Sequence, residues 1–134
     1  MTKTILFLAA AALLAAPAQA APRLTPEQQL AKAIEGRVAG KPVSCIDPRL
    51  NANSRVIDRT AIIYGSGRTI YVQQPANASA LRSDDILLTE LVGTTQLCNI
   101  DMVRLIDRNG FWFRGFVNLN PFVPYTRAEA THRE

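Results

Sequence analysis

Two β-rich runs on either side of a short glycine-containing loop constrain the fold of this 134-residue chain more than any other feature. The runs are Ala61–Tyr64 and Thr69–Val72, and residues 65–68 between them read Gly-Ser-Gly-Arg. This pattern is typical of a β-hairpin, because β-branched and aromatic residues favour strands and glycine favours tight turns. The alternative, a phosphate-binding loop, needs a Gly-Lys-Ser/Thr ending and a following helix, which the sequence lacks there. The segment therefore predicts an antiparallel hairpin.

A second hairpin is predicted nearer the C-terminus. Met102–Ile106 forms its first strand, Asn109-Gly110 supplies a strong turn signal, and Phe111–Val117 provides the returning strand. Gly115 lies within the returning strand, where glycine often marks a bulge or bend. Ile86–Val92 fits either a short helix or a buried strand, and its short length favours a strand.

One helix is predicted before the strands. Residues 25–28 read Thr-Pro-Glu-Gln, which places a capping residue, a first-turn proline and a capping-box glutamine in order. Leu30 and Ile34 then share one helix face that can pack on a sheet, and Gly36 is a suitable stop.

Short strands at turn-separated spacing predict a mainly β fold, a small antiparallel barrel or roll of five to six strands with one N-terminal helix. We expect residues 21–41 to form an N-terminal tail and the helix, and residues 42–126 to form the β domain. Residues 127–134 are expected to be a disordered C-terminal tail.

The first twenty residues have the layout of a secretory signal peptide. Lys3 gives a basic start, Ile5–Ala16 is apolar, and the small residues of Ala18-Gln19-Ala20 predict cleavage between Ala20 and Ala21. An uncleaved anchor is the alternative, but the apolar run is well short of the roughly 20 residues that span a bilayer. We therefore expect an exported protein whose mature part has no transmembrane segment.

Export gives a meaning to Cys45 and Cys98, the two cysteines of the chain. In an oxidising compartment, an even cysteine count predicts a structural disulfide. Closing a loop of about 54 residues stabilises a fold by roughly 4 kcal/mol in the chain-entropy model. A redox-active pair is usually spaced Cys-x-x-Cys, and a zinc site needs further ligands, so neither alternative fits well.

The charge distribution argues against a nucleic-acid partner. The formal net charge is +4, and it falls by one when Lys3 leaves with the signal peptide. The basic residues are scattered among aspartates, which is typical of a solvated surface. A weak preference for anionic glycans or lipid head groups stays open.

No catalytic, metal or cofactor site is predicted. His132, the one histidine, lies in the expected tail, where no partner would hold its orientation. Asp84 and Asp85 are adjacent, and neighbours on a strand point to opposite faces, so we interpret them as loop or cap residues. A carboxylate-dependent hydrolase acting on envelope glycans would need this pair as acid and base.

Trp112 and Arg114 are the candidate binding surface. On a strand, Phe111 and Phe113 share one face, and Trp112 and Arg114 share the other. If the phenylalanines face the core, the tryptophan and the arginine are exposed together, a combination enriched in binding hot spots. The alternative is that a second layer covers this face and Trp112 is packed.

Seven short segments together resemble a group of small exported proteobacterial proteins that carry no assigned function. They are Cys45-Ile46, Ile57-Asp58, Ala61–Tyr64, Thr69–Val72, Leu97-Cys98, Gly115–Val117 and Phe122–Tyr125. The resemblance implies a bacterial periplasmic setting and a bridge between the two cysteines, and it supplies no activity and no site residues.

The favoured hypothesis is a non-enzymatic periplasmic or secreted domain that binds another protein or an envelope component. The alternative is a carrier of a small apolar, lipid-type ligand in an internal barrel pocket.

Overall fold

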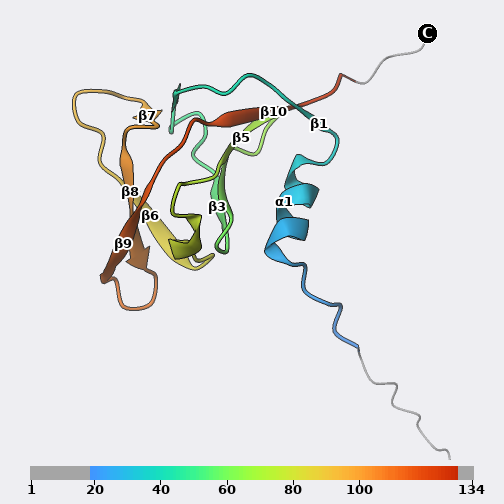
Figure 1. Cartoon of the computed structure of the whole chain (residues 1–134), viewed down its shortest axis with the longest axis horizontal. Coiled ribbons are helices and arrows are strands. Elements are labelled where there is room, and N and C mark those ends of the chain that lie inside the picture. Colours follow the sequence, from blue (N-terminus) through green and yellow to red (C-terminus); the bar gives the residue numbers. More distant parts are fainter. Residues whose placement is uncertain (1–18, 130–134) are drawn as a thin grey trace, which may run out of the picture.

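The structure, a computed structural model, describes residues 19–129. These residues form one α-helix, a short 3-10 helix and ten strands in three antiparallel sheets. Figure 1 shows three layers: the sheet of β6, β8 and β9, then the sheet that contains β3 and β5, then helix α1. The mainly β fold with a helix near the N-terminus is confirmed. The predicted signal peptide lies outside the described residues except for residues 19 and 20, and so do residues 130–134 of the predicted tail.

The largest sheet has five strands, ordered β1-β10-β5-β4-β3. The bounds are β1 Arg37–Ala39, β3 Ser54–Ile57, β4 Ala61–Tyr64, β5 Thr69–Gln73 and β10 Val123–Arg127. The pairing of β4 with β5 confirms the first predicted hairpin.

The second sheet has three strands, ordered β6-β8-β9. The bounds are β6 Asp85–Thr89, β8 Met102–Asp107 and β9 Phe113–Asn118. This confirms the second hairpin and the strand interpretation of the segment that begins at residue 86. A 3-10 turn, η1 (Ala78–Ala80), precedes β6.

The disulfide between Cys45 and Cys98 joins the third sheet. This sheet consists of β2 (Cys45–Ile46) and β7 (Leu97–Cys98), in which the two cysteines are directly paired. The bridge therefore connects the segment between β1 and β3 with the segment that leads into β8, across a sequence separation of 53.

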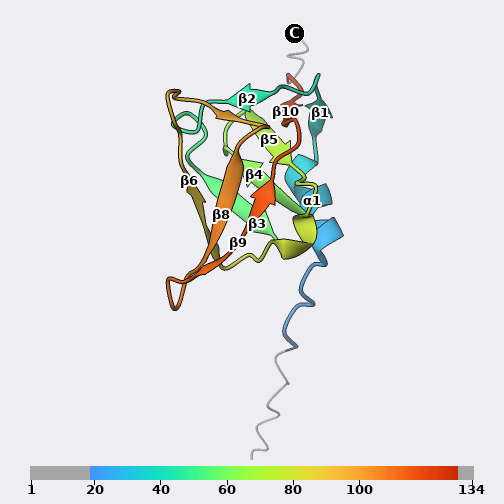
Figure 2. The same cartoon turned by 60° about the vertical axis from the view of Figure 1, so that its left-hand side comes forward.

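Helix α1 covers Pro26–Ile34 and has the predicted start. The Thr25 hydroxyl accepts a hydrogen bond from the Gln28 backbone N–H, and the Gln28 side chain accepts one from the Thr25 backbone N–H. Leu30 packs, as predicted, against a buried cluster formed by Ile57, Ile63 and Ile70. Figure 2 shows α1 beside the five-stranded sheet, on the side of the molecule opposite β6.

The main core lies between the five-stranded and three-stranded sheets. Its fully buried members include Ile62 of β4, Leu105 of β8, Val117 of β9 and Phe122. These side chains occupy the space in which the carrier hypothesis places its ligand. The ring of Tyr64 meets that of Phe122 edge to face, with centroids 5.9 Å apart.

The expected number of strands was too low. The described residues contain ten strands in place of five to six, and their three sheets do not close into a barrel, which was one of the two architectures expected. Strand β2 lies within Val43–Ile46, which was a short strand candidate, whereas β1, β3, β7 and β10 were not expected. These four strands have two to five residues each, and β1, β7 and β10 pair with segments far away in the sequence. Local periodicity carries little information about such pairings.

The expected start of the disordered tail was also wrong, because Arg127 is the last residue of β10, between β1 and β5. Pro124 is compatible with this internal position. Its carbonyl accepts a hydrogen bond from Gly40 N–H, so its nitrogen also faces the β1 side, and no bond to β5 is lost.

Candidate functional site

An apolar surface covers the outer side of the three-stranded sheet. Alternation along β8 and β9 turns Val103 and Val117 into the core, while Met102 is 56% exposed on the other side. We name this surface the outer face and define it by six exposed side chains: Leu88, Val92, Ile100, Met102, Phe113 and Phe116. Five of the six line one shallow hollow of about 270 Å³, and Leu88 lies opposite Arg104, which lines the same hollow.

The hairpin turn between β8 and β9 carries two more exposed aromatic residues. Phe111 is 72% exposed and Trp112 is 57% exposed. One carboxylate oxygen of Asp107 accepts hydrogen bonds of 2.8 Å from the backbone N–H groups of Asn109 and Gly110, which shapes the turn. The indole ring of Trp112 lies directly against Gly110, where a Cβ atom would overlap it. The turn therefore holds the indole in place without burying it.

The premise that would place Trp112 and Arg114 on one surface does not hold. Phe111 lies in the turn before β9, and Phe113 is 59% exposed, so neither phenylalanine faces the core. Gly115 pairs with Leu105 while Phe113 pairs with the next residue of β8, which leaves Arg114 as the extra residue of a β-bulge. The bulge was predicted at Gly115, and its consequence is that Arg114 turns inward.

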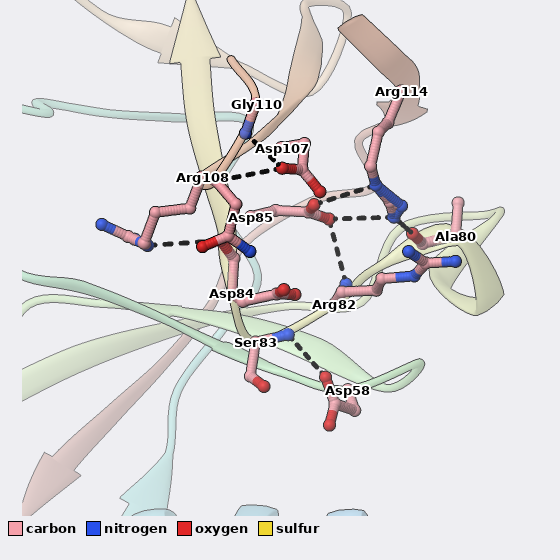
Figure 3. Close-up of polar contacts among 11 residues, drawn as sticks. Asp58, Ala80, Arg82, Ser83, Asp84, Asp85, Asp107, Arg108, Gly110 and Arg114 are labelled. Carbon is pink, nitrogen blue, oxygen red and sulfur yellow. Dashed lines mark hydrogen bonds and ion pairs between the residues drawn. The ribbon is translucent and has the colours of Figure 1, made fainter. Parts of the chain in front are cut away.

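Arg114 forms a buried ion pair with Asp85 (Figure 3). Its Nε lies 3.1 Å from one carboxylate oxygen of Asp85 and its Nη2 lies 3.3 Å from the other, in a bidentate arrangement. The Asp85 side chain is 1% exposed and that of Arg114 is 12% exposed. The Ala80 carbonyl and the Arg82 backbone N–H complete the polar contacts. The pair therefore anchors β9 to the start of β6.

Asp84 and Asp85, the acid–base pair of the hydrolase hypothesis, do not point into one site. Asp85 is buried against Arg114, whereas Asp84 is exposed. Near them, the Asp58 carboxylate accepts a hydrogen bond from the Ser83 backbone N–H, and Arg108 Nε donates to the Asp84 carbonyl (Figure 3). In residues 19–129, no group of three or more histidine, cysteine, aspartate or glutamate side chains is arranged to hold a metal ion.

Burial raises the pKa of the Asp85 carboxyl above its ordinary value of 3.8, and Arg114 offsets part of that shift. A raised pKa means that the folded protein binds this proton more tightly than the unfolded chain does. We therefore expect the Asp85 titration to lower the free energy of unfolding as the pH rises through the window above 3.8. Urea unfolding of wild type and Asp85→Asn across this window tests it. The stability advantage of wild type should shrink with rising pH, and an advantage that grows contradicts the assignment.

Phe111 has a strained backbone, with φ of +56°, which a bulky L-residue rarely adopts. We expect Phe111→Gly to raise the free energy of unfolding by up to about 1 kcal/mol, because glycine has no steric penalty there and the exposed ring contributes little. Urea denaturation measures the change. Phe113→Gly is the control at the first residue of β9, next to the bulge, and it should lower stability. A loss of stability in Phe111→Gly would show that the ring makes a stabilising contact.

Sequence reasoning found Trp112 but missed Met102, Phe116 and Leu88 as parts of the same surface. Residues 102–106 read Met-Val-Arg-Leu-Ile, so both faces of β8 carry apolar residues, which was the available signal. Helix α1 is too short to cross a membrane, and no other helix among residues 19–129 is long and apolar enough to do so. Comparisons of the chain with protein-family models, curated proteins and solved structures found no match.

Proposed function

We propose that this chain is an exported, non-enzymatic binding domain that docks on a protein partner through its outer face and the adjoining hairpin turn. A periplasmic or secreted location is supported by the signal-peptide pattern of the first twenty residues and by the Cys45–Cys98 bridge. The three sheets and the bridge would serve as the rigid scaffold.

The observation that carries this proposal is the clustering of large exposed apolar side chains. Eight of them lie on the outer face and the hairpin turn: Leu88, Val92, Ile100, Phe111, Trp112, Met102, Phe113 and Phe116. Five of the eight line the same hollow, and an exposed apolar patch of this kind typically marks an interaction site. Aromatic residues and methionine are also enriched in protein–protein interfaces.

The left-handed backbone of Phe111 supports the same conclusion. A glycine would relieve the strain, yet the chain carries a large apolar side chain that is mostly solvent-exposed. Strain that persists at an exposed aromatic residue is consistent with a role for its side chain in binding.

Site-specific photocrosslinking tests the proposal. A photoreactive phenylalanine analogue placed at Met102 should capture a discrete partner in the envelope fraction of the source cells. The same analogue at Leu50, which is 83% exposed and lies outside the outer face, is the matched control. The Phe116→Ser substitution should weaken capture from position 102. Equal capture from positions 50 and 102 would contradict the proposal.

A further inference from the structure

A groove separates the edge strand of the five-stranded sheet from the edge strand of the three-stranded sheet. β3 and β6 occupy these two edges, and a groove of about 420 Å³ lies between them. It is lined by Ser54, Arg55, Val56, Ser83, Asp85, Ile86, Leu87 and Arg108. The groove belongs to neither the outer face nor the hairpin turn.

Backbone groups of β3 point into this groove. In an antiparallel pair, successive residues direct their N–H and C=O groups alternately toward the partner strand and away from it. Gly65 N–H donates to the carbonyl of Asn53, so Asn53 and Arg55 face β4. Ser54 and Val56 therefore direct their N–H and C=O groups away from β4, toward the groove.

The same reasoning applies to β6, starting from β9. Asn118 N–H and the Phe116 carbonyl bond to the Asn77 side chain on the outer edge of β9, so Val117 faces β8. Val103 pairs with Val117 and faces β9, so the next residue of β8, Arg104, faces β6 and bonds to Leu88.

Leu87 therefore directs its N–H and C=O groups away from β8, toward the groove. The other edge of the three-stranded sheet, β9, does not have free backbone groups at these positions, because the Asn77 side-chain amide forms hydrogen bonds to them. Two strand edges that have no strand partner among residues 19–129 thus border the same groove.

The groove favours an acidic occupant. Arg55 and Arg108 contribute two positive charges to its lining, whereas the one lining carboxylate, that of Asp85, is already paired with Arg114. One end is closed, because the Asp58 side chain bonds to Ser83 N–H between the end of β3 and the start of β6. A guest strand would therefore be short, on the order of three or four residues at about 3.3 Å each.

We propose that this groove binds a short, extended, acidic peptide segment that adds a strand between β3 and β6. Backbone hydrogen bonds to Ser54, Val56 and Leu87 provide the pairing. Arg55 and Arg108 select carboxylate side chains on the guest.

Peptide titration of the disulfide-bonded protein, followed by calorimetry and by backbone NMR, tests this site. The probe is an end-blocked heptapeptide of alternating valine and glutamate, compared with the same peptide carrying lysine for glutamate. We expect the acidic peptide to bind at least about tenfold more tightly than the lysine peptide, equivalent to about 1.4 kcal/mol. The amide signals of Ser54, Val56 and Leu87 should shift and become protected from exchange.

Two controls separate backbone pairing from charge attraction. N-methylation of alternate amides in the acidic peptide should abolish binding, since it removes the donors along one strand edge. Arg55→Ala with Arg108→Ala should weaken binding about tenfold, whereas Arg49→Ala, an exposed arginine outside the groove, should not change it.

Equal binding of the acidic and lysine peptides, undiminished binding of the methylated peptide, or shifts confined to the outer face would each overturn the proposal. Photocrosslinking at Met102 tests a different surface, so the two proposals fail independently.

Discussion

Replacing Arg114 with alanine should lower the free energy of unfolding by about 3 to 5 kcal/mol. The substitution leaves the Asp85 carboxylate 1% exposed without its bidentate partner, and the Arg82 backbone N–H cannot compensate for a buried charge alone. It also removes the hydrogen bond to the Ala80 carbonyl, which helps to hold η1 against β9. Small domains are stable by roughly 5 to 15 kcal/mol, so this change should consume a large part of the total. Urea denaturation followed by circular dichroism measures it.

Arg104→Ala is the matched control for this prediction. Arg104 also forms an ion pair, with Glu90 at 3.2 Å, but both side chains are at least half exposed. Exposed pairs are worth about 0 to 1 kcal/mol, so this substitution should have little effect. The double substitution Asp85→Leu, Arg114→Met should recover most of the lost stability, because no unpaired charge is left in the core. If Arg104→Ala and Arg114→Ala lower the free energy of unfolding by similar amounts, burial does not explain the contribution of the Asp85–Arg114 pair.

Opening the Cys45–Cys98 disulfide should lower the free energy of unfolding by about 4 kcal/mol. The bridge closes a loop with a sequence separation of 53, so the unfolded chain gains much conformational freedom when it is reduced. Ile46 and Leu97, the neighbours of the cysteines in β2 and β7, are buried in the main core, so the expected loss comes mainly from the freed unfolded chain. Denaturation with and without a reductant measures the difference.

The double substitution Cys45→Ala, Cys98→Ala provides the control for effects of the reductant itself. It should match the reduced wild-type protein in stability and should be insensitive to reductant. Thiol titration of the unfolded, unreduced protein should find no free cysteine. Equal stability of the oxidised and reduced forms would contradict the expected contribution of the bridge.

The elements that were predicted correctly are those whose signals lie close together in the sequence. The helix follows from the capping residues Thr25 and Gln28 and from the spacing of Leu30 and Ile34. The two hairpins follow from a turn signal between adjacent β-rich runs. The strands β1, β3, β7 and β10 were missed, because they are short, and β1, β7 and β10 also pair with partners distant in the sequence. Pro124 has no N–H to donate within a sheet, and only the pairing of β10 shows that this disrupts no bond to β5.

For the candidate site too, the sequence indicated some of the residues and only the structure revealed the others. The sequence indicated Trp112 as a candidate for binding, and the residue is indeed exposed. It did not indicate the Asp85–Arg114 pair, since 29 residues separate the two and no local pattern links them. A bulge displaces one residue from the alternation of a strand, so the side chain of Arg114 points opposite to the expectation from regular β geometry. The groove between β3 and β6 likewise depends on how two sheets meet.

By itself, the sequence determined the helix, the two hairpins, the mainly β class and the pairing of its two cysteines. These follow from local geometry or from the lack of any other cysteine partner. Only the tertiary structure decided the number of strands, the outer face of β6, β8 and β9, the burial of Asp85 with Arg114, and the open edges beside the groove. The physical reason is that local patterns specify backbone conformation over a few residues, whereas exposure and charge pairing depend on contacts between segments far apart in the chain.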